Sequence, residues 1–473
     1  MTHKYRKPTF LESLSTIIFM VIVVVIGFIF FNIPIQILLL ISSAYAAFIA
    51  YRVGLRWEEL EEGITKRLTT AMPAIFIILA VGIIVGSWMF SGTVPALIYY
   101  GLKFLNPSYF LVSAFIISAI TSVATGTAWG SASTAGIALI SISNQLGVAP
   151  GMAAGAIIAG AVFGDKMSPL SDTTNLAALV TKVNIFAHIK SMMWTTIPAS
   201  IIGMIVWFFA GLHSKGHTNP KQIQTLLHEL DKVYNINLIV WIPLVVIAVC
   251  LFLRVSTVPS MLISSLSALI VGTFNNHFNI VDGLKAMFEG FNHSMVNQSH
   301  LSKNVTTLIE QGGMMSMTEI IVTIFCGYAF AGIVEKAGCL DVMLNTVSKG
   351  VKSVGTLILI TVVCSLMLVF AAGVASIVII MVGVLMKEMF EKMNLSRSVL
   401  SRTLEDSSTM ILPLIPWGTS GIYYSHQLNV SVGDFFIWTV PCYLCALIAI
   451  TYGFTGIGCL LYTSDAADDM QCV

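Results

Sequence analysis

Two carboxylic acids lie seven residues apart in a stretch rich in neutral oxygen atoms. The stretch, residues 164–175, reads GDKMSPLSDTTN and contains Asp165 and Asp172. Its neutral oxygen-bearing side chains are Ser168, Ser171, Thr173, Thr174 and Asn175. Small hard cations are bound by carboxylate, carbonyl and other oxygen ligands. The stretch therefore predicts a cation site in which Asp165 and Asp172 hold Na+.

The spacing of the two acids allows two local structures. In an unbroken helix, residues seven apart share one face. The Ser168-Pro169 pair predicts a break instead, so that the acids flank an unwound turn whose freed carbonyls add further ligands. The hydroxyl and amide side chains could also cap the second half-helix, with Asp172 as its N-cap. Capping and ion binding are compatible.

Asp165 can hold a proton or a cation, but not both well. Burial favours the protonated form of a carboxylic acid, and a neighbouring lysine such as Lys166 favours the ionised form. When protons and sodium compete for one site that faces one side at a time, the result is antiport. The structural alternative is a plain Asp165–Lys166 ion pair. Adjacent helical residues point in different directions, which argues against that pair.

The composition is that of a membrane protein. Of the 473 residues, 56% are apolar and 10% are charged, compared with about 25% charged in soluble domains. The mean hydropathy is +0.89. The net charge of +1 gives no indication of a nucleic-acid partner. An ionisable group in hydrocarbon costs about 2.5–3.5 kcal/mol, so those at Asp165, Asp172, Glu405 and Asp406 are interpreted as functional.

The elements that carry these residues are predicted to be transmembrane helices. With about 20 residues needed per span, the chain offers about eleven or twelve candidates. They lie near 14–31, 35–51, 71–90, 109–140, 149–181, 191–211, 237–253, 258–273, 317–335, 356–386, 398–422 and 434–461. Several are too long or too polar for one plain helix, which predicts an all-α polytopic fold with discontinuous helices.

The second half of the chain resembles the first. The Gly-rich stretch 125–136 corresponds to 370–376, and 164–175 corresponds to 404–409, where Asp406-x-x-Thr409 repeats the Asp165-x-x-Ser168 spacing. Asp406 becomes a candidate cation-site residue from this repeat alone. The predicted organisation is a helix hairpin plus interfacial helix (1–70), a first transporter repeat (71–211), connecting helices and loops (212–316), a second repeat (317–461) and a non-native tail (462–473).

Basic residues predict the orientation of the chain. They precede the first hairpin and follow it, at Lys4, Arg6, Lys7, Arg52, Arg56, Lys66 and Arg67. Because cytoplasmic loops carry an excess of Lys and Arg, the N-terminus is predicted to be cytoplasmic.

Two motifs make the chain similar to a known family. Residues 126–130 (GTAWG) and 164–175 resemble signature stretches of the NhaC-type Na+/H+ antiporters, and the similarity extends to about Leu460. The resemblance implies exchange of Na+ for H+, which are substrates rather than cofactors, at the bacterial cytoplasmic membrane, for pH and sodium homeostasis. It implies Asp165, Ser168, Asp172, Thr173 and Asn175 as cation-site residues, with Thr127 and Ser131 as neighbours.

The resemblance leaves alternatives. The family also includes exchangers of malate and protons for lactate and sodium, and such an anion would need a cation, for which Lys166 and Arg402 are candidates. Acidic residues at two broken helices favour a transporter over a channel or receptor. No Ser-His-Asp, zinc or phosphate-cradling pattern stands in a suitable context, so no enzyme is predicted. Formation of a homo-oligomer is left open.

Overall fold

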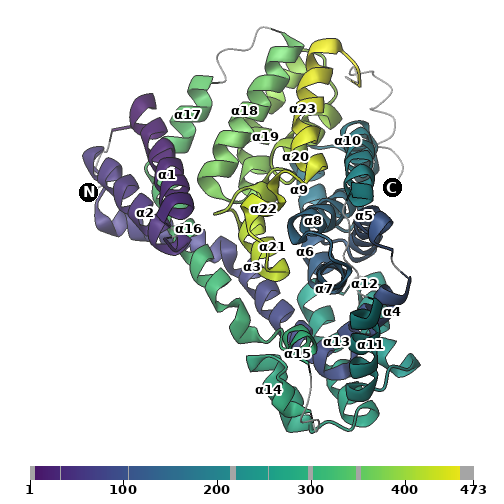
Figure 1. Cartoon of the computed structure of the whole chain (residues 1–473). Coiled ribbons are helices and arrows are strands. Elements are labelled where there is room, and N and C mark those ends of the chain that lie inside the picture. Colours follow the sequence, from purple (N-terminus) through teal and green to yellow (C-terminus); the bar gives the residue numbers. More distant parts are fainter. Residues whose placement is uncertain are drawn as a thin grey trace.

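The computed structural model describes residues 6–31, 33–104, 106–213, 220–253, 255–296, 302–347 and 353–458. These residues form helices joined by short turns, with no β-strand among them (Figure 1). The predicted tail 462–473 and Lys4 lie outside the described residues. Within the described chain, the predicted all-α polytopic membrane fold is confirmed.

Seven helices in the described part of the chain are long and apolar enough to cross a membrane. They are α1 (Phe10–Phe31), α2 (Ile35–Arg52), α3 (Trp57–Ser91), α10 (Ile185–His213), α13 (Thr257–Asn275), α16 (Thr318–Lys336) and α18 (Val354–Ala372). An eighth span results if the end of α11 (Pro220–Val233) and the helical segment Leu238–Cys250, which meet at 89°, are counted as one. The predicted spans 109–140 and 149–181 are instead built from shorter pieces. Each piece is no longer than the roughly 20 residues that a single membrane crossing needs.

The other helices form the connections and the broken segments. They are α4 (Thr93–Phe104), α5 (Pro107–Thr125), α6 (Ala128–Ser131), α7 (Ile137–Leu146), α8 (Pro150–Met167), α9 (Asp172–Thr181), α11 (Pro220–Val233), α12 (Ile242–Phe252), α14 (Ile280–Glu289), α15 (Lys303–Ile309), α17 (Cys339–Val347), α19 (Ala375–Lys392), α20 (Arg397–Ser407), α21 (Thr419–Leu428), α22 (Val432–Phe436) and α23 (Val440–Thr455). A π-helical stretch, Ala132–Gly136, joins α6 to α7. Single 3₁₀ turns occupy Leu238–Trp241, His293–Met295, Met314–Met317 and Leu412–Leu414.

Helix α3 differs from the prediction because it is continuous. The expected interfacial helix and the expected span that follows it form one helix of 35 residues, with Pro73 inside it. The predicted division at residue 70 therefore falls within a helix. Figure 1 also shows that the N-terminal pair α1 and α2 lies beside α16 and α17, so segments far apart in sequence are packed together.

Glycine allows α5 and α8 to approach closely. A Cβ atom at Gly160 would lie 2.3 Å from the carbonyl oxygen of Phe115, and one at Gly164 would lie 2.3 Å from that of Ala119. Ser122 Oγ donates to the carbonyl of Ala161 across the same contact (2.6 Å). Small residues at a helix interface let backbones pack at short range in lipid. This contact fixes α8, which carries Asp165, against the preceding helix.

The same backbone break occurs twice. Helix α5 ends before Gly126 (φ +69°), which is followed by an extended Thr127 and by α6. Helix α18 ends before Gly373 (φ +65°), which is followed by an extended Val374 and by α19. A left-handed glycine is a common way to end a helix. The identical order of conformations supports the internal repeat, while the borders of the five predicted segments remain predictions.

Candidate cation site between two broken helices

The break between α8 and α9 is built by residues 168–171. Ser168 is extended (φ −91°, ψ 126°), as expected of a residue before proline. Ser171 is also extended, and its hydroxyl accepts from the Thr174 N–H (3.5 Å). The N-cap is therefore Ser171. The interpretation from sequence that Asp172 is the N-cap is wrong. Asp172 is the first helical residue, and its carboxylate accepts from the Thr173 N–H (2.8 Å).

A cavity of about 340 Å³ lies at this break. It draws residues from both halves of the chain, including the α5–α6 break and the α18–α19 break. Its lining consists of Thr70, Pro73, Ile77, Thr127, Ala128, Trp129, Val162, Asp165, Asp172, Thr173, Tyr328, Val374, Ala375, Ser376, Thr409, Leu412, Thr419, Ser420 and Tyr424. Asp165 and Asp172 are the only charged residues in this described lining. Asp165 is 9% exposed, whereas Asp172 is more open.

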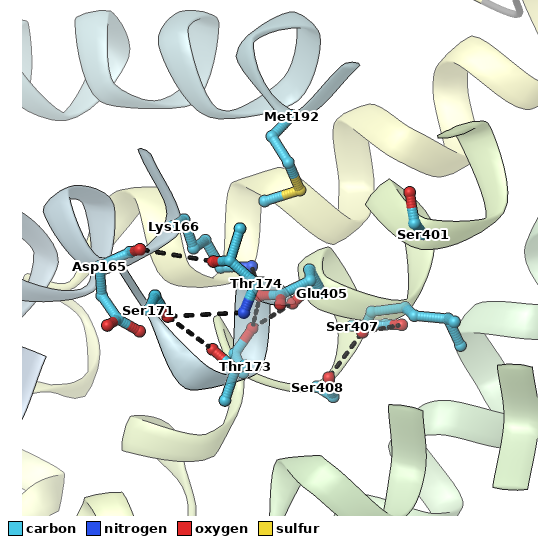
Figure 2. A network of polar contacts seen from close by, with 12 residues as sticks. Asp165, Lys166, Ser171, Thr173, Thr174, Met192, Ser401, Glu405, Ser407 and Ser408 are labelled. Atoms are coloured by element: carbon cyan, nitrogen blue, oxygen red, sulfur yellow. Dashed lines mark hydrogen bonds and ion pairs between the residues drawn. The ribbon is translucent and has the colours of Figure 1, made fainter. Parts of the chain in front are cut away.

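Hydrogen bonds connect the start of α9 to the end of α8. The Thr174 hydroxyl donates to the backbone carbonyl of Asp165 (3.4 Å), and the hydroxyls of Ser171 and Thr173 are 3.2 Å apart. Figure 2 shows these contacts beside the Asp165 carboxylate. They hold the two half-helices in a fixed relation, so that both acids face one space.

The predicted site residues divide into two groups. Four of them line the cavity: Thr127, Asp165, Asp172 and Thr173. Three others, Ser131, Ser168 and Asn175, brace the backbone around it. Ser168 donates to the carbonyl of Val123 (3.0 Å) and Ser131 to that of Ser118 (2.8 Å). The Asn175 amide donates to the carbonyls of Pro169 (2.8 Å) and Ser171 (2.6 Å).

Asp406 is fully buried and does not contribute to the cavity lining. Its neighbour Glu405 reaches toward the site instead, because it accepts from the hydroxyl of Thr409, which does line the cavity. The repeat pointed to Asp406, whereas the acid of this segment that contacts a cavity-lining residue is Glu405. The helix turn at α20 determines which of two neighbouring acids faces the first half, and sequence spacing did not resolve this.

A buried ion pair joins the two halves. Lys166 Nζ lies 3.0 Å from Glu405 Oε2, and both side chains are 0% exposed. The lysine extends toward Glu405, away from the Asp165 carboxylate (Figure 2). The Asp165–Lys166 pair considered from sequence is thus replaced by a contact between α8 and α20.

Lys166 and Arg402 were also the candidate cations for an organic anion. Arg402 is fully buried and donates to the carbonyl of Gly458 (3.1 Å), and neither residue lines the cavity.

The cavity is also lined by aromatic side chains, most of which the sequence did not indicate. Tyr328 comes from α16 and Tyr424 from α21, far from either motif in sequence. No spacing signal connects them to residues 164–175, since only the packing of distant helices brings them together. Trp129 lies within the GTAWG motif, so for this one aromatic residue the sequence did contain a signal.

Comparisons with known proteins agree with the motifs. A sequence profile described as the Na+/H+ antiporter family matches residues 160–457. An uncharacterized Na+/H+ antiporter of Haemophilus influenzae is 35% identical over 459 residues, covering 97% of this chain and 98% of the relative. The malate-2H+/Na+-lactate antiporter of Bacillus subtilis is 32% identical, covering 95% of this chain and 96% of the relative. The Na+/H+ antiporter NhaC of Alkalihalophilus pseudofirmus is 32% identical and covers 90% of each chain.

These relatives are transporters, in agreement with the expectation of a transporter rather than an enzyme. Because the profile covers most of the chain and the relatives align with it almost from end to end, the chain belongs to the Na+/H+ antiporter family.

Proposed function

We propose that the protein exchanges Na+ for H+ across the bacterial cytoplasmic membrane by competition at Asp165 and Asp172. The observation that carries this proposal is a cavity at a helix break whose charged lining residues are both carboxylates. Hard cations need oxygen ligands, and the same cavity offers the hydroxyls of Thr127 and Thr173.

The two ions compete because they need opposite states of the same groups. A protonated carboxylic acid is neutral and has lost the charge that attracts Na+. Loss of the proton restores that charge and opens the site to sodium. If the cavity opens to one side at a time, the Na+ released to one side is replaced at the carboxylates by protons from that same side, and these protons are released on the other side, which is antiport. The basic residues around the first hairpin support a cytoplasmic N-terminus.

Exchange of organic acids is the alternative suggested by the malate-2H+/Na+-lactate relative. A dicarboxylate would need a cationic partner, and the described cavity lining contains none. Arg67 contacts the cavity-lining Tyr328, with its guanidinium carbon 5.8 Å from the ring centroid, but it is paired with Glu335 (3.3 Å). The lining thus favours a cation as the substrate.

Everted membrane vesicles with a pH-sensitive dye distinguish the two functions. We expect Na+ alone to dissipate an acid-inside gradient in vesicles that contain the wild-type protein. The substitutions Asp165→Asn and Asp172→Asn are each expected to reduce the response to that of vesicles without the protein. Asp282→Asn is the matched control, since Asp282 lies on α14 beside Lys285 (3.8 Å) and outside the cavity.

Immunoblotting of the vesicles verifies that all variants insert. A requirement for malate or lactate would replace the proposed function with organic-acid exchange. Wild-type responses in both cavity variants would refute the carboxylate site.

A further inference from the structure

A second, much smaller cavity adjoins the large one. Its volume is about 10 Å³, which is about the space that a single water molecule needs. Tyr328 and Thr419 line both cavities, so the two share a wall. The lining of the smaller cavity also includes Gly327 and Ile422. The small cavity therefore lies between α16 and α21, next to the space that the carboxylates face.

The two helices present one face each to this contact. The face of α16 carries residues that are four apart in sequence, Glu319, Thr323 and Gly327. The face of α21 carries residues at intervals of three and four, Thr419, Ile422 and His426. Such spacings place side chains on one side of a helix. We refer to the contact between these two sets of residues as the seam.

The seam joins the ion cavity to one surface of the protein. Tyr328 and Thr419 lie at its cavity end. At its other end, Glu319 Oε2 lies 3.6 Å from His426 Nε2, and the two side chains are 71% and 34% exposed. The helices therefore run in opposite directions along the seam, which begins at a surface carboxylate and ends at the cavity.

The seam is closed in this structure but is loosely filled at its centre. Thr323 is buried, and its hydroxyl accepts from the Gln36 amide of α2 (2.7 Å). Ile422 is buried as well. A Cβ atom at Gly327 would meet nothing closer than 3.8 Å. Tightly interlocked side chains resist separation, so a contact with unfilled space at its centre is a place where two helices can part.

The open end of the seam points away from the basic end of the molecule. Lys336 lies at the other end of α16 and pairs with Glu62 near the start of α3 (2.7 Å). The basic residues of that region support a cytoplasmic location. Helix α16 has 19 residues, which is about one membrane crossing. Glu319 accordingly belongs to the outer side.

We propose that the seam is the path by which Na+ and H+ pass between the cavity and the outer side of the membrane. The two helices part to open it, and Gly327 leaves room for the ion at its centre. Glu319 attracts cations to the outer end, because a surface carboxylate raises their local concentration. The inference rests on the proposed function, since it supplies the outer path of the same exchange.

Filling the centre of the seam tests the path without changing the carboxylates. We expect Gly327→Leu to reduce the Na+ response of everted vesicles to that of vesicles without the protein. Na+ should still raise the melting temperature of the purified variant, because the exposed Asp172 gives it a separate entry. Gly327→Ala should reduce the response far less. Gly433→Leu is the matched control, since only Ser431 Oγ lies near that glycine, at 3.7 Å.

Reversing the charge at the outer end tests the sidedness of the path. In right-side-out vesicles with an imposed acid interior, added Na+ approaches the outer face. We expect Glu319→Lys to raise the half-maximal Na+ concentration several-fold there, and less at high salt. In everted vesicles, where added Na+ approaches the inner face, this concentration should change little. Asp282→Lys is the matched control, since Asp282 lies on α14, which contacts the turn before α16 but not the seam.

The outcomes separate this inference from the proposed function. A wild-type response in Gly327→Leu, or equal losses in Gly327→Leu and Gly433→Leu, would overturn the path. Equal shifts in Glu319→Lys and Asp282→Lys, or equal shifts in both vesicle orientations, would overturn it too, and this exposed substitution decides alone if Gly327→Leu does not fold. A wild-type protein without any Na+ response would refute the proposed function and this inference with it.

Discussion

At the scale of single residues, the site combines charges with different tasks. Asp165 and Asp172 face the cavity, whereas Lys166 and Glu405 neutralise one another behind it. Without Glu405, the lysine next to Asp165 would be a buried charge with no counterion, and it would attract the Asp165 carboxylate. In the proposed function, the ion pair therefore keeps Asp165 available to Na+ and H+.

Removing one partner of this pair should be costly. We expect Glu405→Gln to lower the free energy of unfolding by about 3–5 kcal/mol, the usual effect of leaving one buried charge alone. Melting of the purified protein, followed by tryptophan fluorescence in detergent, measures the loss. The charge-reversed double variant Lys166→Glu/Glu405→Lys should recover part of it. If the double variant loses as much as the sum of its single variants, the two side chains are not coupled.

The residues of the site were predictable where they are neighbours in sequence. Asp165, Asp172 and Thr173 share one motif, and polar groups in an apolar segment stand out against their surroundings. Ser168 and Asn175 belong to the same motif, but they hydrogen-bond to backbone carbonyls around the break. Side-chain direction at a broken helix depends on the turn geometry. Composition therefore indicated the segment at the cavity without separating the residues that line the cavity from those that brace its backbone.

At the scale of helices, the site depends on the close packing of α5 on α8. The short distances at Gly160 and Gly164 leave no room for a side chain. This requirement is a property of two helices together. The sequence alone predicted breaks at glycine and proline, but it did not predict which helix would lie against the glycines.

A methyl group at this contact should separate the helices. Gly160→Ala would place a Cβ atom 2.3 Å from the Phe115 carbonyl oxygen, and overpacking of this kind costs about 1–3 kcal/mol. We expect a lower melting temperature and a weaker Na+ response, because α8 carries Asp165.

Gly433→Ala is the control for this substitution. Near Gly433 only Ser431 Oγ lies within reach of a new Cβ atom, at 3.7 Å. Alanine is also the better helix former by about 1 kcal/mol, so the control should be neutral or slightly stabilised. Equal destabilisation by both substitutions would show that close packing at Gly160 is not the cause.

At the scale of the whole molecule, two similar halves meet at the cavity. The Gly126 and Gly373 breaks contribute lining residues from opposite halves, and the Lys166–Glu405 pair connects α8 to α20. The membrane class followed directly from composition, because too few charged residues are present to cover a soluble surface. The division of long apolar stretches into half-helices, and the fusion of two expected elements into α3, depend on tertiary contacts that hydropathy does not contain.

Since both halves contribute to the cavity, occupancy by Na+ should stabilise the entire fold. A ligand that binds only the folded state adds about 2.7 kcal/mol at a concentration of 100 Kd. We expect Na+ to raise the melting temperature of the wild-type protein in detergent, and Asp165→Asn to abolish this increase. Potassium chloride at equal ionic strength separates specific binding from screening of surface charge.

The stabilisation of the protein by Na+ should also increase with pH. Protonation of the carboxylates removes their charge, so Na+ stabilises the protein at high pH and loses this effect as the pH falls. Where the site is mostly protonated, a tenfold rise in proton concentration raises the apparent Kd for Na+ about tenfold per proton displaced, which is about 1.4 kcal/mol. Melting curves across a grid of pH and Na+ concentration measure this shift. A Na+ effect that stays constant down to acid pH would mean that protons and sodium bind at separate groups, and exchange would then require a mechanism other than competition at Asp165 and Asp172.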